Sequence, residues 1–260
     1  MRFRTVFLSL SLLLLSIPVR AQESSPPLTL NAIFAPIVVG TPPTNAFNGL
    51  ARMPDGEIRH YVGSDYIASK DEGLTWSELQ NPESAPPTKG QGLGISPSTG
   101  TCLRMIGHAE EGTFVLRSTQ GVVGHYERIP VDPRRFIMIR PPYFSPSRDL
   151  ILFAGHTGGD PKQIGVFRSE NDGRTWQRTL LEPGPYFEVV PPHAKPRWEN
   201  NCCEPTILEL KDGRLWMLAR TSQDMMYECY SNDAGASWSS WTPPSFYGTL
   251  TMSTLHRLSD

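Results

Sequence analysis

An eight-residue pattern occurs three times in this chain, at Ser69–Trp76, Ser169–Trp176 and Ser231–Trp238. Each copy reads Ser-x-Asp/Asn-x-Gly-x-Ser/Thr-Trp, so the polar, glycine and tryptophan positions recur together. A strict pattern that recurs at wide spacing indicates one structural unit repeated along the chain. This repeat constrains the fold more strongly than any other feature of the sequence.

The chemistry of the pattern predicts a tight turn that is anchored by a buried ring. Short Ser, Asp and Asn side chains bond to nearby backbone N–H groups and so favour turns. The glycine of each copy can adopt backbone conformations that other residues resist, and the tryptophan buries a large ring. Strand-like sequence precedes each copy, such as Gly165–Arg168 before the second.

These copies resemble the Asp-box, or bacterial neuraminidase repeat, of the sialidase superfamily. In that family the box is a hairpin turn on the outer edge of a propeller blade, and its role is structural rather than catalytic. The resemblance covers about residues 45–260 and implies an all-β fold, the sialidase-type six-bladed β-propeller.

A second repeat, made of a strand, a turn and another strand, alternates with the boxes. Turn-forming residues are flanked by short apolar segments, which is the signature of a β-hairpin. The hairpins begin roughly 40–65 residues apart, a spacing typical of propeller blades. The four turns lie at residues 54–56, 96–100, 145–149 and 211–213.

Four blades are therefore predicted, within a propeller domain assigned to residues 46–260. The box of the second blade is expected near Arg117–Gly121, as a degenerate copy without the Asp and the Trp. After the fourth blade, Leu255–Asp260 is typical of the first strand and turn of a fifth. Because propellers of this family close with six blades, we expect the chain to be truncated after about four.

Residues 1–21 have the features of an export signal. Arg2 and Arg4 precede an apolar run from Val6 to Ile17, and Val19–Ala21 is a suitable cleavage site. The run is too short, and too interrupted by serine, to predict a membrane span, and no second candidate follows it. We therefore expect a secreted or periplasmic protein in which residues 22–45, rich in proline, form a linker.

Charge and cysteine content narrow the choice of partners. Without the three arginines of the signal, the chain has 21 basic and 26 acidic residues and no basic block, which disfavours nucleic acid and anionic membranes. An acidic substrate would need locally placed arginines.

The four cysteines could form disulfides in an oxidising compartment, and the pairings Cys202–Cys229 and Cys203–Cys229 both stay open. The cysteines are Cys102, Cys202, Cys203 and Cys229. No metal-ligand spacing occurs, and no cofactor is implied.

The segment Asn201–Arg220 bears the strongest resemblance to a sialidase site. Many members of the superfamily contain Asn-Glu-x-x-x-x-Glu-Leu-x-Asp-Gly-Arg-Leu, with an arginine sixteen residues after the first Glu, and Glu204 and Arg220 match this spacing. The resemblance implies that Glu204 activates a tyrosine nucleophile and that Arg220 is one of three arginines that bind the substrate carboxylate. A carboxylate nucleophile would be repelled by sialic acid, whereas arginine binds a carboxylate bidentately.

A structural interpretation of this pair stays open beside the catalytic one. Glu204 precedes a proline and could be an ordinary polar residue at the start of a strand. Arg220 could pair with Glu228 or Asp224 at the edge of a blade.

Three further residues are candidates for the site. By resemblance, Asp65 stands near the position of the acid/base aspartate before the first box, although it could equally be a plain loop residue. Arg140 precedes the third blade and His156 belongs to a Gly-rich stretch that includes Asp160, so both could bind substrate in the central funnel. His156 could act as an acid or base, or be a solvated loop histidine.

The sequence departs from the family pattern at the first blade. Sialidases usually have Phe-Arg-Ile-Pro there, but this chain has Asn48 at the arginine position. Arg52 and Arg59 are the nearest alternatives, and strand alternation and turn position fit neither of them well. The nucleophilic tyrosine and the third arginine are expected beyond residue 260.

The leading prediction is an exported exo-α-sialidase-like glycosidase that acts on terminal acidic sugars of glycans. Asn48 and His156 motivate an alternative, a polysaccharide lyase or other uronate-processing enzyme, which needs a base and charge neutralisation. A non-catalytic glycan-binding propeller is the third hypothesis, because a fold does not imply a function.

Overall fold

The described residues of this computed structural model form fifteen β-strands, all paired antiparallel, and no helix. They belong to a unit that spans Val39–Asp260. The structure describes residues 50–62, 65–80, 93–119, 126–137, 140–159, 162–184, 202–221, 225–246, 248 and 252–257. The predicted signal, the linker and the domain boundaries lie outside these residues and stay predictions.

The strands form four sheets that follow chain order. The first contains β1 (Leu50–Arg52), β2 (Ile58–Val62) and β3 (Asp65–Ser69), and the second contains β4 (Leu93–Ile95), β5 (Cys102–His108), β6 (Gly112–Ser118) and β7 (Glu127–Asp132). The third contains β8 (Phe136–Ile137), β9 (Tyr143–Phe144), β10 (Ile151–Thr157), β11 (Ile164–Ser169) and β12 (Gln177–Leu180), and the fourth contains β13 (Cys203–Glu209), β14 (Leu215–Arg220) and β15 (Tyr227–Ser231).

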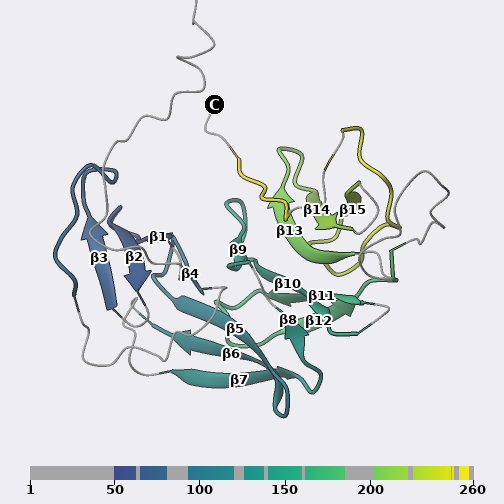
Figure 1. Cartoon of the computed structure of the whole chain (residues 1–260), viewed down its shortest axis with the longest axis horizontal. Coiled ribbons are helices and arrows are strands. Elements are labelled where there is room, and N and C mark those ends of the chain that lie inside the picture. The colour runs from purple at the N-terminus through teal and green to yellow at the C-terminus, as the bar shows by residue number, and fades with distance from the viewer. Residues whose placement is uncertain are drawn as a thin grey trace, which may run out of the picture. The chain divides into compact units, whose positions relative to one another are not determined.

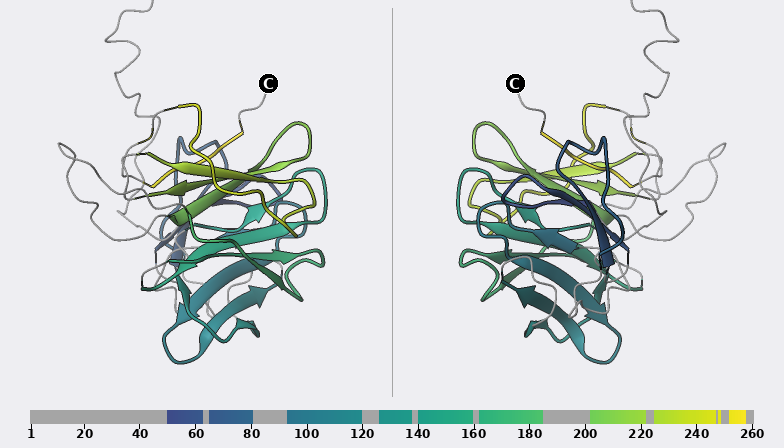
Figure 2. Two further views of the ribbon diagram at one scale, coloured as in Figure 1. Left: turned by 90° about the vertical axis from the view of Figure 1, so that its right-hand side faces the viewer. Right: turned by 90° about the vertical axis from the view of Figure 1, so that its left-hand side faces the viewer.

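This arrangement confirms the predicted all-β propeller blades. In Figure 1 the four sheets follow one another around an arc, and Figure 2 shows the third and fourth sheets as adjacent layers, in agreement with the contact between β10 and β13. Each predicted turn joins two paired strands, namely β1 to β2, β4 to β5, β9 to β10 and β13 to β14.

Apolar side chains hold each sheet against the next. Between the third and fourth sheets, Leu152 and Ala154 of β10 pack in one cluster with Ile207 of β13 and Met217 of β14. Similar clusters join the second sheet to the third and the first to the second. The second and third sheets have a neighbour on each face, and most residues of their central strands β5, β6, β10 and β11 are buried.

The three boxes form the predicted turns, with one addition. The serine hydroxyl accepts a hydrogen bond from the glycine N–H at 2.8–2.9 Å in every copy. The residue before each glycine also has a left-handed backbone, with φ of 59° at Glu72, 58° at Asp172 and 58° at Ala234. The sequence pattern assigned this conformation to the glycine alone, because the preceding position carries no fixed residue type.

In the second sheet, strand β6 ends in the same way as the corresponding strands of the other three sheets. Strand β6 stops at Ser118, just as β3, β11 and β15 stop at the first serine of a box. Of the degenerate box predicted near Arg117–Gly121, residues 120 and 121 lie outside the described residues.

Two expectations need correction. Of the predicted fifth-blade strand, Leu255–Arg257 is described and is not a strand; the Arg257 guanidinium instead donates to the carbonyl of Glu209 at the end of β13. All four cysteines are buried free thiols, so neither proposed disulfide forms.

Within the described ranges, no helix has the length and hydropathy to cross a membrane.

Candidate functional site

The candidate residues of the third and fourth sheets lie at corresponding ends of their sheets. Glu204 lies at the start of β13 and Arg220 at the end of β14, where Cys203 pairs with Arg220. Arg140 precedes β9, and His156 is next to last in β10, which runs antiparallel to β9. Strand direction therefore brings the four residues to one end of these two adjacent sheets.

The backbone at Glu204 is unusual. Glu204 has a φ of +51°, in the left-handed region, and the strand register shifts between Cys203 and Thr206. Pro205 has no N–H to donate to the ladder, which favours a bulge at this point. A left-handed conformation costs a residue with a side chain about 1–2 kcal/mol. Such strain is found most often at functional sites.

The bulge directs the Glu204 carboxylate to Arg220. The Arg220 guanidinium donates from Nη1 to Glu204 Oε2 at 2.7 Å, and the two side chains are only 18% and 16% exposed. No hydrogen bond from a described residue reaches Glu204 Oε1. Glu228, the alternative partner of Arg220, accepts a hydrogen bond from the Trp216 ring N–H at 2.9 Å, and Asp224 lies outside the described residues.

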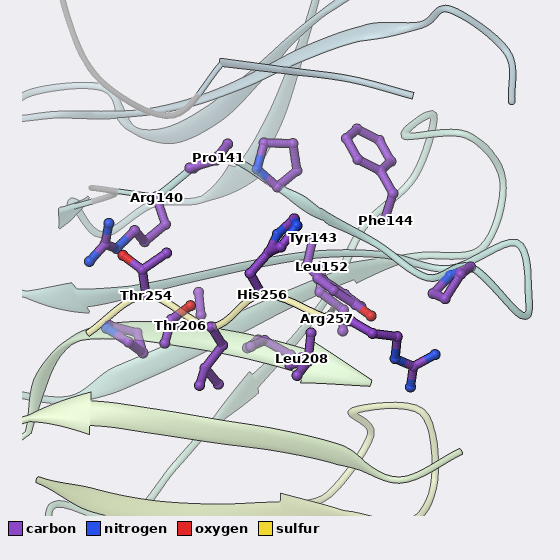
Figure 3. Close-up of a pocket in the computed structure, with 16 residues that line it drawn as sticks. Arg140, Pro141, Tyr143, Phe144, Leu152, Thr206, Leu208, Thr254, His256 and Arg257 are labelled. Carbon is purple, nitrogen blue, oxygen red and sulfur yellow. The ribbon is translucent and has the colours of Figure 1, made fainter. Parts of the chain in front are cut away.

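Arg140 brings a second guanidinium near the same carboxylate. Its Nη2 donates to the carbonyl of Ser253, and its Nε is buried with no hydrogen-bond partner among the described residues. Burial lowers the pKa of Arg140, and the negative charge of Glu204 opposes this effect. Figure 3 shows Arg140 beside Thr254, where both line a cavity of about 570 Å³ that also includes Pro205.

His156 is buried in a strand, so the alternative of a solvated loop histidine is wrong. Its side chain is 6% exposed, and Nδ1 lies 2.9 Å from the carbonyl oxygen of Thr157. Burial lowers the pKa of His156, while the Thr157 carbonyl and Glu204 raise it and Lys162 lowers it further. Asp160, named with His156 in the sequence, lies outside the described residues.

Asp65 is not brought to this cluster by any contact between described residues. It begins β3, in the sheet at the left of Figure 1, whereas β13 lies at the right. Asp65 and Arg220 lie at corresponding ends of their sheets, because Asp65 follows the second strand of the first sheet and Arg220 ends the second strand of the fourth. One carboxylate oxygen, Oδ1, is buried with no partner in the described part of the chain.

The first-blade arginines have other partners. Arg52 binds Glu72 at 2.6 Å, and Arg59 binds Glu57 at 2.7 Å while its guanidinium lies 4.4 Å from the Tyr66 ring centroid. Asn48 lies outside the described residues. The structure therefore offers Arg140 as the second guanidinium near Glu204.

Two neighbours of the cluster were not singled out from the sequence. Lys162 acts electrostatically on both His156 and Cys203. Burial raises the pKa of the Cys203 thiol to about 11, and Glu204 raises it while Arg220 and Lys162 lower it. Lys162 had no motif to mark it, because only the pairing of β10 with β11 brings it beside His156.

The cluster suits an anionic ligand. Arg140 and Arg220 act on the Glu204 carboxylate, Lys162 acts on the neighbouring His156 and Cys203, and burial lowers the pKa of His156. Arginine forks bind carboxylates with charge-assisted hydrogen bonds. Among the described residues, no group of three or more His, Cys, Asp or Glu side chains could hold a metal ion.

Comparison with known proteins locates a family match in the same region. Residues 137–247 match the family described as "BNR repeat-like domain". No curated protein matches the sequence. A crystal structure of a protein of unknown function from Dyadobacter fermentans has 18% identity and a TM-score of 0.51, with 78% of this chain and 70% of that chain covered.

Two glycosidase structures are more distant. A mutant of NanB sialidase from Streptococcus pneumoniae has 11% identity and a TM-score of 0.46, with 77% of this chain and 52% of that chain covered. An α-L-arabinofuranosidase from Fusarium graminearum has 17% identity and a TM-score of 0.41, with 57% and 47% covered. The chain thus spans about half the length of these two enzymes.

Proposed function

We propose that this chain, a BNR-repeat protein with the sialidase-type β-propeller fold of glycoside hydrolases, cleaves terminal acidic sugars from glycans. The observation that carries the proposal is the geometry of Glu204. A glutamate in a left-handed conformation, in a bulge, paired with Arg220 and flanked by Arg140, is not required for the stability of an ordinary strand. Strain of this kind is retained where a side chain must be aimed.

Each residue has a specific role in this proposal. Arg220 and Arg140 bind the sugar carboxylate through charge-assisted hydrogen bonds from their guanidinium groups. Glu204 accepts a proton at Oε1 from the hydroxyl of the attacking nucleophile as the oxygen of that hydroxyl bonds to the anomeric carbon. The leaving-group oxygen takes a proton from Asp65, and water completes the hydrolysis. The roles of Glu204 and Asp65 rest on the family resemblance.

The test is release of a fluorogenic leaving group from an α-sialoside by the full-length product. Arg220→Ala should abolish release, because the substrate carboxylate loses a charge-assisted partner. Arg214→Ala is the matched control, since Arg214 is an exposed arginine of the same hairpin whose guanidinium binds Asp212 and lies 5.3 Å from the Tyr230 ring centroid. Equal loss in both variants, or release unchanged by Arg220→Ala, would contradict the proposal.

A uronate lyase is the second candidate function, and the lowered pKa of the buried His156 ring favours it. A neutral imidazole near the Lys162 ammonium is a suitable base for removing a proton next to a carboxylate. Ultraviolet absorbance of unsaturated uronate products distinguishes this reaction from hydrolysis.

Export of the chain is part of the proposal. The basic and apolar segments before Val19–Ala21 support it. N-terminal sequencing of the secreted product should begin at Gln22, whereas a product that begins at Met1 would contradict export.

A further inference from the structure

His156 ends a row of side chains that faces the fourth sheet. Leu152, Ala154 and His156 share one face of β10, because side chains alternate along a strand. Leu152 and Ala154 are buried in the core that the third and fourth sheets share. The row ends in a histidine near the start of β13.

Packing alone does not explain a histidine at this position. The ring is 6% exposed, so it has lost most of its hydration. Burying a polar ring without a purpose is unfavourable compared with burying leucine or valine. We therefore expect the His156 ring to have a chemical role that the stability of the fold does not require.

The hydrogen bond of the ring determines its tautomer. Nδ1 lies 2.9 Å from the carbonyl oxygen of Thr157, and a carbonyl can only accept. Nδ1 must therefore carry the proton in the neutral ring, and Nε2 retains its lone pair. Nε2 is thus a hydrogen-bond acceptor and a base.

Burial, more than the surrounding charges, favours the neutral form of the ring. Glu204 from β13 is the nearby carboxylate, and Lys162 before β11 is the nearby cation. The flanking strands place Ile137 and Ile164 opposite His156, and these add no charge. Burial and Lys162 outweigh the effects of the Thr157 carbonyl and Glu204, so the pKa is lowered and the neutral form prevails at pH 7.

We propose that His156 is a specificity-determining residue, whose Nε2 accepts a hydrogen bond from a hydroxyl or amide N–H of the ligand. The site then selects a sugar that carries such a donor close to its acidic group. This rests on the proposed binding of an acidic sugar, with the carboxylate at Arg140 and Arg220.

Nitrogen NMR of the full chain, labelled with ¹⁵N on its histidines, tests the tautomer directly. The six histidine rings are assigned with the help of His156→Gln, which removes one of them. At pH 7 the Nε2 of His156 should be unprotonated, and N-acetylneuraminic acid should shift its resonance. A protonated Nε2, or an Nε2 resonance unmoved by a sugar that binds, would overturn the proposal.

Two amide variants separate the roles of the two ring nitrogens. Asparagine places an N–H donor near Nδ1 and keeps the contact with Thr157, whereas glutamine places an acceptor near Nε2. His156→Gln should keep kcat/KM within about threefold of the wild type, and His156→Asn should lower it about tenfold, the effect of one lost hydrogen bond. The opposite order would show that only the contact with Thr157 matters.

Failure of this inference is distinguishable from failure of the proposed function. If a neutral sugar such as galactose shifts the Nε2 resonance and no acidic sugar binds, the proposed function fails and the role of His156 stands. If sialoside release is intact and His156→Asn leaves it unchanged, the proposed function stands and the role of His156 is wrong.

Discussion

At the scale of single residues, the sequence singled out Glu204 and Arg220 but predicted neither their ion pair nor the backbone conformation of Glu204. The sixteen-residue spacing matched a known pattern, and the pair forms at 2.7 Å. The left-handed φ of Glu204 depends on the bulge before Thr206, which appears only when β13 pairs with β14. The burial of His156 was missed because the following Gly158 and Gly159 indicated a loop, although β10 continues to Thr157.

Strain at Glu204 can be measured by comparing two variants that both lack the carboxylate. Glu204→Gly should be more stable than Glu204→Ala by about 1 kcal/mol, because only glycine adopts a left-handed φ without a penalty. Urea unfolding of both variants measures the difference. At Gln177, in the ordinary strand β12, the same two substitutions should show the reverse order. Alanine more stable than glycine at position 204 would contradict the strained conformation.

At the scale of elements, hydrogen-bonded carboxylates connect successive sheets. Asp172, in the box of the third sheet, accepts hydrogen bonds from Thr99, Thr101 and Arg117 of the second at 2.6–2.8 Å. Glu209 of β13 accepts hydrogen bonds from Ser145, Ser147 and Arg148 of the third sheet. None of these pairings was evident from the sequence, because the paired residues are far apart in the chain. Arg117 and Asp172 are 55 positions apart, and the residues of every other pair are more than 60 positions apart.

The connection at Asp172 should make stability depend on pH. Burial alone would raise the pKa of Asp172, but the hydrogen bonds from Thr101, Thr99 and Arg117 lower it overall. The stabilisation is therefore complete above the unfolded pKa of about 4 and is lost as pH falls through the lower folded pKa. Asp172→Asn should cost about 2 kcal/mol at neutral pH.

Urea unfolding of wild type and Asp172→Asn across acidic pH checks this effect. The difference in unfolding free energy should shrink as the medium is acidified below the unfolded pKa. Asp149→Asn, at an exposed aspartate of the neighbouring turn, should show no comparable cost. A difference that stays constant with pH would mean that the charge of Asp172 is not involved.

The boxes should contribute unequally to stability. In the second box, Ser169 Oγ accepts from the Gly173 N–H in a buried setting, whereas the equivalent bond of Ser69 is only partly buried. Ser169→Ala leaves that N–H unsatisfied and should lower the unfolding free energy by about 1–3 kcal/mol. Thermal unfolding should show a smaller loss for Ser69→Ala. A larger loss for Ser69→Ala would contradict this assignment.

At the scale of the whole molecule, the repeat pattern predicted the blades, their turns and their order. These features are local, because each hairpin and box is encoded within a few consecutive residues. The site is not local. Arg140 meets Glu204, and Lys162 meets Cys203, only when the third and fourth sheets pack, so the sequence could name candidates without showing which of them meet.

The central claim is that Glu204 performs chemistry on an acidic sugar, and its conservative amide variant tests this most directly. The measurement is the rate of leaving-group release from a fluorogenic α-sialoside by full-length wild type and Glu204→Gln, with thermal unfolding of both. The account predicts that release falls by orders of magnitude while the unfolding temperature stays nearly unchanged, because glutamine keeps the shape of the side chain and loses the base. Release that survives the substitution in a folded protein would contradict it.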